Sequence, residues 1–126
     1  GLQICVGRNG AENDKLTLQL ARGNDWFFHA SGTAGSHVIV RVEKKQTVPL
    51  ESLLDAAQLA KYYSKARDWG TVEVAYTPKK YVTKPRAAKP RLVILSRCKT
   101  ILISTEKARL DRLTRGEPEA MDREAD

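Results

Sequence analysis

Apolar and polar residues alternate along the first third of the chain, as they do in half-buried strands. The alternation starts at Leu2, reappears in Leu16, Leu18 and Leu20, and is followed by an aromatic strand and an aliphatic one. Glycine, asparagine and aspartate separate these segments, so we predict short turns between antiparallel neighbours. The four expected strands are residues 2–6, 16–20, 26–29 and 36–42.

One long helix is predicted after these strands. Pro49 stands at the position of a first-turn proline, Thr47 is a candidate N-cap, and Gly70 is expected to end the helix. Small residues in its apolar stripe favour close packing on a sheet. The stripe consists of Leu53, Ala56, Ala57, Ala60 and Tyr63, and Gln58, Lys61 and Lys65 are expected to point away.

The remaining segments complete an α+β pattern. Residues 72–76, 92–95 and 101–103 are expected to be strands, and Leu110 with Leu113 indicates a short final helix. We therefore predict a mostly antiparallel β-sheet with one long helix packed on a face and a short C-terminal helix. Residues 1–116 are expected to form a single domain, and residues 117–126 a disordered tail.

Composition narrows the class of protein. The 126 residues suit one domain, and 41% hydrophobic with 29% charged residues describes a folded, water-exposed chain. No apolar run reaches the ~18 residues that cross a bilayer, and no signal-peptide pattern opens the chain. Cys5 and Cys98 are single thiols with no metal-binding spacing. We expect a cytoplasmic protein without metal or cofactor, and no membrane partner.

The charge is concentrated in one segment of a chain whose net charge is +7. Residues 76–100 carry eight cations and no carboxylate. A run of one sign repels itself, so it favours a polyanionic partner, although a merely solvated face is the alternative. The segment predicts a nucleic-acid or ribosome contact surface. Its cations are Lys79, Lys80, Lys84, Arg86, Lys89, Arg91, Arg97 and Lys99.

Both histidines fall in turn-rich sequence, and three readings of them stay open. His29 and His37, joined by a glycine-rich loop, could lie at the same edge of a hairpin. With Asp25 and Ser36 they offer acid, base and nucleophile, yet no Gly-x-Ser-x-Gly motif is present and the spacing fits no standard metal site. The other two readings are imidazoles hydrogen-bonded beside a turn, and imidazoles that contact RNA.

Aromatic residues beside cations are further candidates. Either Trp26 or Phe28 is expected in the core, with Phe27 on the opposite face of the strand. Tyr62 stands close to Lys65 and Arg67, an arrangement that suits base stacking. Phe27 and Tyr81 are the other candidate stacking residues. In the turn Gly7-Arg8-Asn9-Gly10, Arg8 is a candidate anion contact.

The order of these motifs resembles the NFACT-R domain family. The resemblance runs from Leu2 to about Ser104 and is carried by Gly7-Arg8-Asn9, Asn13-Asp14, Thr17, Asp25, Phe28-His29, Gly35-Ser36-His37-Val38, Ala57, Leu59-Ala60, Tyr63-Ser64-Lys65-Ala66-Arg67, Tyr76-Thr77, Lys84-Pro85 and Lys99-Thr100-Ile101. The resemblance implies that this chain is an RNA-binding module that acts in translation. In the larger proteins of that family, this domain accompanies others that bind tRNA on stalled large ribosomal subunits and support tailing of the nascent chain.

There are departures from the family pattern. Phe27 stands where a tryptophan is usual, Ala34 replaces a proline, and Arg91 replaces a glycine. Tailing activity depends on the other domains, so the resemblance implies only RNA or ribosome binding here.

We therefore predict that the chain binds tRNA or ribosomal RNA, with the large ribosomal subunit as a further partner, in ribosome quality control or RNA modification. Two alternatives stay open: a small RNA-processing or RNA-modifying enzyme using His29 and His37, and an interaction module for an acidic protein. No catalytic residue is predicted. The predicted nucleic-acid-binding residues are Arg8, Asn9, Asp25, His29, Gly35, Ser36, His37, Lys65, Arg67, Lys79, Lys80, Lys84, Arg86, Lys89 and Arg91.

Overall fold

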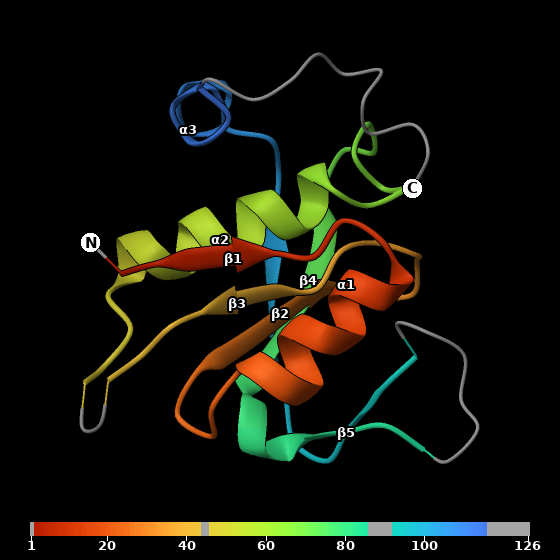
Figure 1. Ribbon diagram of the computed structural model, residues 1–126. Coiled ribbons are helices and arrows are strands. Elements are labelled where there is room, and N and C mark those ends of the chain that lie inside the picture. Colours follow the sequence, from red (N-terminus) through yellow and green to blue (C-terminus); the bar gives the residue numbers. More distant parts are fainter. Residues whose placement is uncertain (1, 44–45, 86–91, 116–126) are drawn as a thin grey trace.

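Five antiparallel strands form the main sheet in the order β1-β3-β2-β4-β7 (Figure 1). The computed structural model describes residues 2–43, 46–85 and 92–115. The strands are β1 (Ile4–Val6), β2 (Trp26–Ala30), β3 (Val38–Val40), β4 (Val72–Pro78) and β7 (Lys99–Ile103). A separate two-stranded ribbon joins β5 (Val82–Thr83) to β6 (Ile94–Leu95). The predicted α+β fold class is confirmed.

The central strand β2 is buried on both faces. Phe28 is fully buried in the core that faces α2 (Leu50–Tyr62), and Phe27 is 1% exposed in a second core on the other face. Successive side chains of a strand point to opposite faces, so both faces of this sheet must be covered. The predicted placement of Phe28 and Phe27 on opposite faces is confirmed. Phe27 is too deeply buried to stack on a base, so its candidacy as a stacking residue was wrong.

Helix α2 covers the first face, with α3 (Lys107–Leu113) lying beyond it (Figure 1). Ala56, Ala57 and Ala60 are completely buried against the sheet, as the predicted stripe required. Their short side chains bring the helix backbone close to the strands. The helix ends at Tyr62 rather than near Gly70, and its first turn has no side-chain cap from Thr47.

Two polar residues of α2 that were predicted to point away are buried. Gln58 and Lys61 are each 1% exposed, because residues 104–106 cross the outer side of the helix and enclose them. Gln58 Oε1 accepts a hydrogen bond of 2.7 Å from the Glu106 amide. The Lys61 ammonium donates to Thr105 Oγ1 at 2.8 Å and to the Arg67 carbonyl at 2.6 Å. Burial lowers the pKa of Lys61, and nearby Asp68 acts in the opposite direction.

A network of charges holds α3 against α2. Asp55 of α2 accepts hydrogen bonds of 2.7 Å from both Arg109 and Arg112 of α3. Hydrogen bonds from Arg109 to Asp55 and Glu106 raise the pKa of this guanidinium above its ordinary value. The short final helix predicted around Leu110 and Leu113 is confirmed.

The second face is covered by helix α1 (Gly10–Asp14) and the π-helical segment η1 (Lys15–Leu20), which lie on the other side of the sheet from α2 (Figure 1). The prediction of a strand at residues 16–20 was therefore wrong. Asn9 caps the helix, its side chain accepting from the Glu12 amide at 2.9 Å. Asn13, Leu16 and Thr17 are buried at the i, i+3 and i+4 spacing of one helix face, whereas a strand would not turn the consecutive residues Leu16 and Thr17 to the same side.

Several predictions concern residues outside the described ranges. These are the disordered tail at residues 117–126 and the contacts of Arg86, Lys89 and Arg91. Within the described ranges, no helix combines the length and the apolar character needed to cross a membrane.

Candidate nucleic-acid interface

The loop Gly35-Ser36-His37 is held at one end of the sheet, between α2 and α1. Gly35 forms an isolated bridge with Ser64, and the Ser36 amide donates to the Tyr63 carbonyl at 3.0 Å. A Cβ atom on Gly35 would lie 2.7 Å from the Ser64 Cβ, closer than real side chains approach. Glycine is therefore needed for the loop to dock here, and docking places residues 62–67 beside it.

His37 joins this loop to the α1–η1 segment. Its ring is fully buried, with Nδ1 2.8 Å from Thr17 Oγ1. Its backbone amide donates to Asn13 Oδ1 at 3.0 Å, and Asn13 Nδ2 donates to the Gly35 carbonyl at 3.4 Å. These contacts give His37 a role in positioning the loop.

The two histidines are neighbours, as the hairpin hypothesis predicted. The rings of His29 and His37 are 5.7 Å apart at an angle of 88°. His29 is half-buried on β2, and the ring of Phe27 also packs against both imidazoles. Ser36 is 4% exposed. His29, Ser36 and His37 were all predicted to contact RNA. In the structure Ser36 and His37 are buried and His29 is half-buried, so little of these side chains is accessible to a ligand.

A group of cations and tyrosines lies next to the loop; Tyr63 is only 8% exposed, whereas Arg8, Tyr62 and Arg67 are half-buried. Arg67 stacks over the Tyr62 ring at 4.2 Å, and its Nε donates to the Tyr62 carbonyl at 2.6 Å. The guanidinium of Arg8 lies 5.6 Å from the centre of the Tyr63 ring, which in turn meets Tyr62 edge-on. Lys65, which lies between Tyr63 and Arg67 in the sequence, is exposed. We call Arg8, Tyr62, Tyr63, Lys65 and Arg67 the tyrosine–arginine surface.

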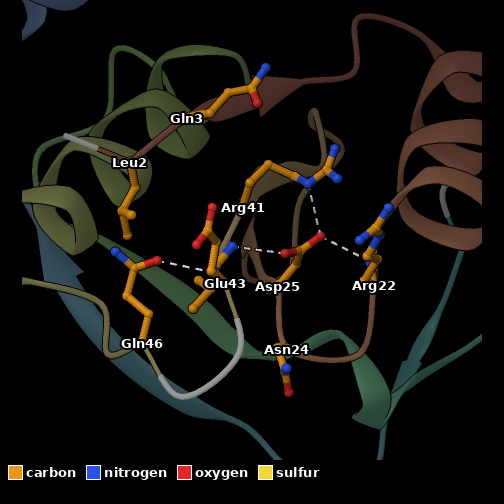
Figure 2. A pocket seen from close by; sticks show the side chains of 9 residues that line it. Leu2, Gln3, Arg22, Asn24, Asp25, Arg41, Glu43 and Gln46 are labelled. Carbon is orange, nitrogen blue, oxygen red and sulfur yellow. Dashed lines mark hydrogen bonds and ion pairs between the residues drawn. The ribbon is translucent and has the colours of Figure 1, made fainter.

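Asp25 precedes β2 and therefore lies at the opposite end of the sheet from the Gly35-Ser36-His37 loop. Figure 2 shows its contacts with its neighbours. Its carboxylate is 1% exposed and accepts hydrogen bonds from the amides of Arg22 and Val42, at 2.9 and 2.8 Å. The Nε atom of Arg41 lies 3.1 Å from the same carboxylate. Asp25 thus ties the turn before β2 to the end of β3. The two arginines stand beside a hollow of about 700 Å³.

The described part of the basic segment is divided between two places. Lys79 and Lys80 form the short helix η2 (Lys79–Tyr81) after β4, where the Lys80 ammonium lies 5.3 Å from the centre of the Tyr81 ring. Lys84 instead pairs with Asp14 of α1 at 3.5 Å. The residues were predicted to form one face. In the structure, their backbone path turns them toward different neighbours.

Strand register decides which candidates come together. Phe28 pairs with Val38 at one end of the sheet, and Trp26 pairs with Val40 and Pro78 at the other. The first end gathers Arg8, Asn9, His29, the Gly35-Ser36-His37 loop, Lys65 and Arg67. The second end gathers Asp25, Lys79 and Lys80. The predicted residues that the structure describes therefore do not form a single site.

Sequence reasoning missed the polar residues that hold the loop. Asn13 and Thr17 are completely buried. Thr17 alternates with leucines and so looks like the exposed face of a strand, and Asn13 beside Asp14 looks like part of a turn. One available signal was the spacing of Asn9 and Glu12, which is that of a helix cap. Glu12 also accepts from the Arg8 amide at 2.9 Å, completing the N-terminal turn.

Within the described ranges, no group of three or more His, Cys, Asp or Glu side chains could hold a metal ion. Cys5 and Cys98 are both free thiols.

Comparison with known proteins gives one family. Residues 1–92 match the family described as the NFACT protein RNA binding domain. The Rqc2 homolog RqcH of Bacillus subtilis (strain 168) is 35% identical over 106 residues, which cover 84% of this chain and 18% of that protein. The protein of the same name from Streptococcus suis (strain 05ZYH33) is 36% identical over 101 residues, covering 80% of this chain and 18% of its own length.

A solved structure shows the same fold. It is the C-terminal part of the fibronectin/fibrinogen-binding protein from Streptococcus suis, with a TM-score of 0.79 and 34% sequence identity. The match covers 86% of this chain and 43% of that one. The chain thus spans less than a fifth of the length of the two RqcH proteins it matches.

Proposed function

The chain belongs to the family of NFACT protein RNA-binding domains, and we propose that it is an RNA-binding module that holds phosphates on the tyrosine–arginine surface. The carrying observation is the contact between Arg67 and Tyr62. Stacking at 4.2 Å together with the Nε hydrogen bond fixes the plane of the guanidinium before RNA arrives. A fixed guanidinium loses little conformational freedom on binding, and its remaining N–H groups can pair with two phosphate oxygens.

Arg8, close to the Tyr63 ring, and the exposed Lys65 add two cations to this surface. The Gly35 loop supports it, because the loop bonds to residues 63–65 on one side and to α1 on the other. Lys79 and Lys80, at the far end of the sheet, add long-range attraction for a polyanion. Such contacts carry no base sequence. We expect micromolar affinity and little sequence discrimination at physiological salt.

The RNA that we propose is tRNA or ribosomal RNA, in ribosome quality control. The support is the name of the relatives, Rqc2 homolog RqcH, together with what the NFACT-R family implies. Because those proteins are much longer than this chain, we assign to it only the binding contribution and leave targeting to other components.

Binding without cleavage is the second part of the proposal. His37 is buried and its Nδ1 atom is already within hydrogen-bonding distance of Thr17, which does not favour a proton-transfer role. RNA incubated with the purified chain, with and without divalent metal, should stay intact. Metal-dependent cleavage that disappears in His37→Ala would instead favour the enzyme alternative.

Salt dependence tests the phosphate contacts. If about five phosphates are engaged, the logarithm of affinity should fall with the logarithm of salt at a slope near −4. Replacing Lys65 and Arg67 together by alanine should weaken tRNA binding about tenfold or more and make the slope shallower by about two. Lys107→Ala is the matched control, because this exposed lysine already pairs with Asp111 on α3.

Parent-like tRNA affinity in the double variant would contradict the proposal. Competition provides an independent outcome: an acidic protein that displaces tRNA completely, while tRNA fails to displace the protein, would favour the interaction-module alternative.

A further inference from the structure

A pocket of about 330 Å³ opens where β2 begins and β4 ends, at the other end of the sheet from the tyrosine–arginine surface. Its walls come from β2, β4, η2, β7 and the turn before β7. Three of its lining residues are aromatic and two are cations. They are Trp26, Tyr76, Tyr81, Arg97 and Lys99, and Pro78 forms part of the wall between them.

The aromatic rings leave apolar surface open to a ligand. Trp26 and Tyr76 lie 5.7 Å apart at a tilt of 40°, so neither ring covers the face of the other completely. One side of Tyr76 is stacked on the buried Phe28 at 5.4 Å, which holds the ring in place. Tyr81 is half-buried. Rings held in this way resemble the rigid platforms on which unpaired bases stack in single-strand-binding proteins.

The rim of the pocket is positively charged. Arg97 lies 5.3 Å from the centre of the Tyr81 ring, and Lys99 is exposed at the start of β7. None of the described residues that line the pocket is a carboxylate. Considering only residues 2–43, 46–85 and 92–115, no ion pair neutralises Lys80, Arg97 or Lys99. An uncompensated cationic rim around an aromatic floor complements a nucleotide, which carries an anionic phosphate next to a flat base.

We propose that this pocket takes one unpaired nucleotide of RNA. The base lies among the rings of Trp26, Tyr76 and Tyr81, and Arg97 with Lys99 holds the adjoining phosphate. This deepens the proposed function and rests on it, because it states that single-stranded segments are the preferred form of the RNA. A paired base cannot enter, since its face is covered within the duplex.

The surroundings allow the strand to continue. A smaller hollow of about 220 Å³ shares Trp26 and Pro78 with this pocket and adds Lys80 to the lining. Beyond it, the hollow beside Asp25 carries Arg22 and Arg41. Cations thus recur along the same end of the sheet, together with Glu43, which lines both hollows, and Asp25, which pairs with Arg41.

The fluorescence of Trp26 can report whether a ligand enters the pocket. The chain has two tryptophans, Trp26 in the pocket and Trp69, which is 56% exposed. In a Trp69→Phe variant of the full chain, fluorescence reports Trp26 alone. Titration with a single-stranded oligoribonucleotide should quench this emission, because stacking brings the base onto the indole. A duplex of the same sequence, and heparin as a polyanion without bases, should bind without comparable quenching.

Affinities then separate the pocket from the tyrosine–arginine surface. Tyr81→Leu, which keeps an apolar side chain, and the exposed Arg97→Ala should each weaken single-strand binding about five- to tenfold. Duplex binding should change less than about twofold in Tyr81→Leu. Replacing Lys65 and Arg67 by alanine should instead weaken the binding of single-stranded and duplex RNA by similar factors.

Each outcome is decisive. Equal quenching by heparin, or unchanged single-strand affinity in folded Tyr81→Leu and Arg97→Ala, would overturn the nucleotide pocket and leave the RNA-binding function standing. Failure of the parent chain to bind either RNA even at low salt would overturn both.

Discussion

Thr17 Oγ1 lies 2.8 Å from His37 Nδ1, and both side chains are completely buried. This contact joins the helical segment on one face of the sheet to the loop that docks against the end of α2. A buried hydroxyl and a buried ring nitrogen each need a partner, and each supplies the other's. The loop's position is therefore coupled to a segment twenty residues earlier in the chain.

Removing that hydroxyl should destabilise the fold. Thr17→Val keeps the shape of the side chain but removes the hydroxyl that faces the buried His37 Nδ1, at a cost of about 1–3 kcal/mol in the free energy of unfolding. Thr17→Ser, which retains the hydroxyl, should lose less. Urea denaturation of the three proteins measures the difference. A valine variant with the parent's midpoint would mean that the contact contributes nothing to stability.

Glycine at position 35 should be required by packing alone. Gly35→Ala places a Cβ atom 2.7 Å from Ser64 Cβ and 3.0 Å from its Cα, so either the loop or the end of α2 must move. We expect a loss of about 1–3 kcal/mol in unfolding free energy and weaker tRNA binding. Gly70→Ala is the control, because nothing lies within 4 Å of its added Cβ atom. Equal stability of the two variants would contradict this account.

Asp25 should act on stability rather than on RNA affinity. Asp25→Ala removes the acceptor of the Arg22 and Val42 amides and the partner of Arg41, so we expect a loss of about 2 kcal/mol or more. Asp25→Asn keeps one acceptor oxygen and should lie in between. Thermal denaturation gives the stability, and tRNA affinity is measured where each variant remains folded. Weaker binding by a fully folded Asp25→Asn would restore Asp25 as an RNA contact.

Alkaline pH should reveal the buried ammonium of Lys61. Burial holds its pKa in the folded chain below the ordinary value of 10.5, so between those two values the unfolded chain binds more protons than the folded one. The free energy of unfolding therefore rises with pH in that window. The stability that this pKa difference contributes is fully present above pH 10.5, and it is lost as the pH falls through the pKa of Lys61 in the folded chain.

Lys61→Met lacks this proton and isolates its effect. The stability of the parent minus that of the variant should increase from about pH 7 to about pH 10, as measured by urea denaturation at each pH. Subtraction removes the titration of the tyrosines, which both proteins share. A difference that stays constant, or falls, over this range would show that Lys61 titrates as it does in the unfolded chain.

The sequence by itself determined the elements whose burial follows one simple period. The alanine stripe of α2 was predictable because its apolar positions face one core, and the aromatic strand was predictable because Phe27 and Phe28 alternate between two cores. The α+β class followed from these elements, and the family resemblance followed from short motifs at the loop and at the end of α2. Local chemistry was sufficient wherever the core is apolar and the neighbours are close in sequence.

Only the tertiary structure decided the second face of the sheet and the division of the site. Residues 16–20 alternate like a strand, but Phe27 and Ile39 need cover, and the Asn9 cap starts a helix that supplies it. Lys61 is enclosed by a segment more than forty residues away. Strand register likewise sends Arg67 and Lys80 to opposite ends of the sheet. These outcomes depend on contacts between distant segments, and a local pattern of residues contains no information about which distant segment will arrive.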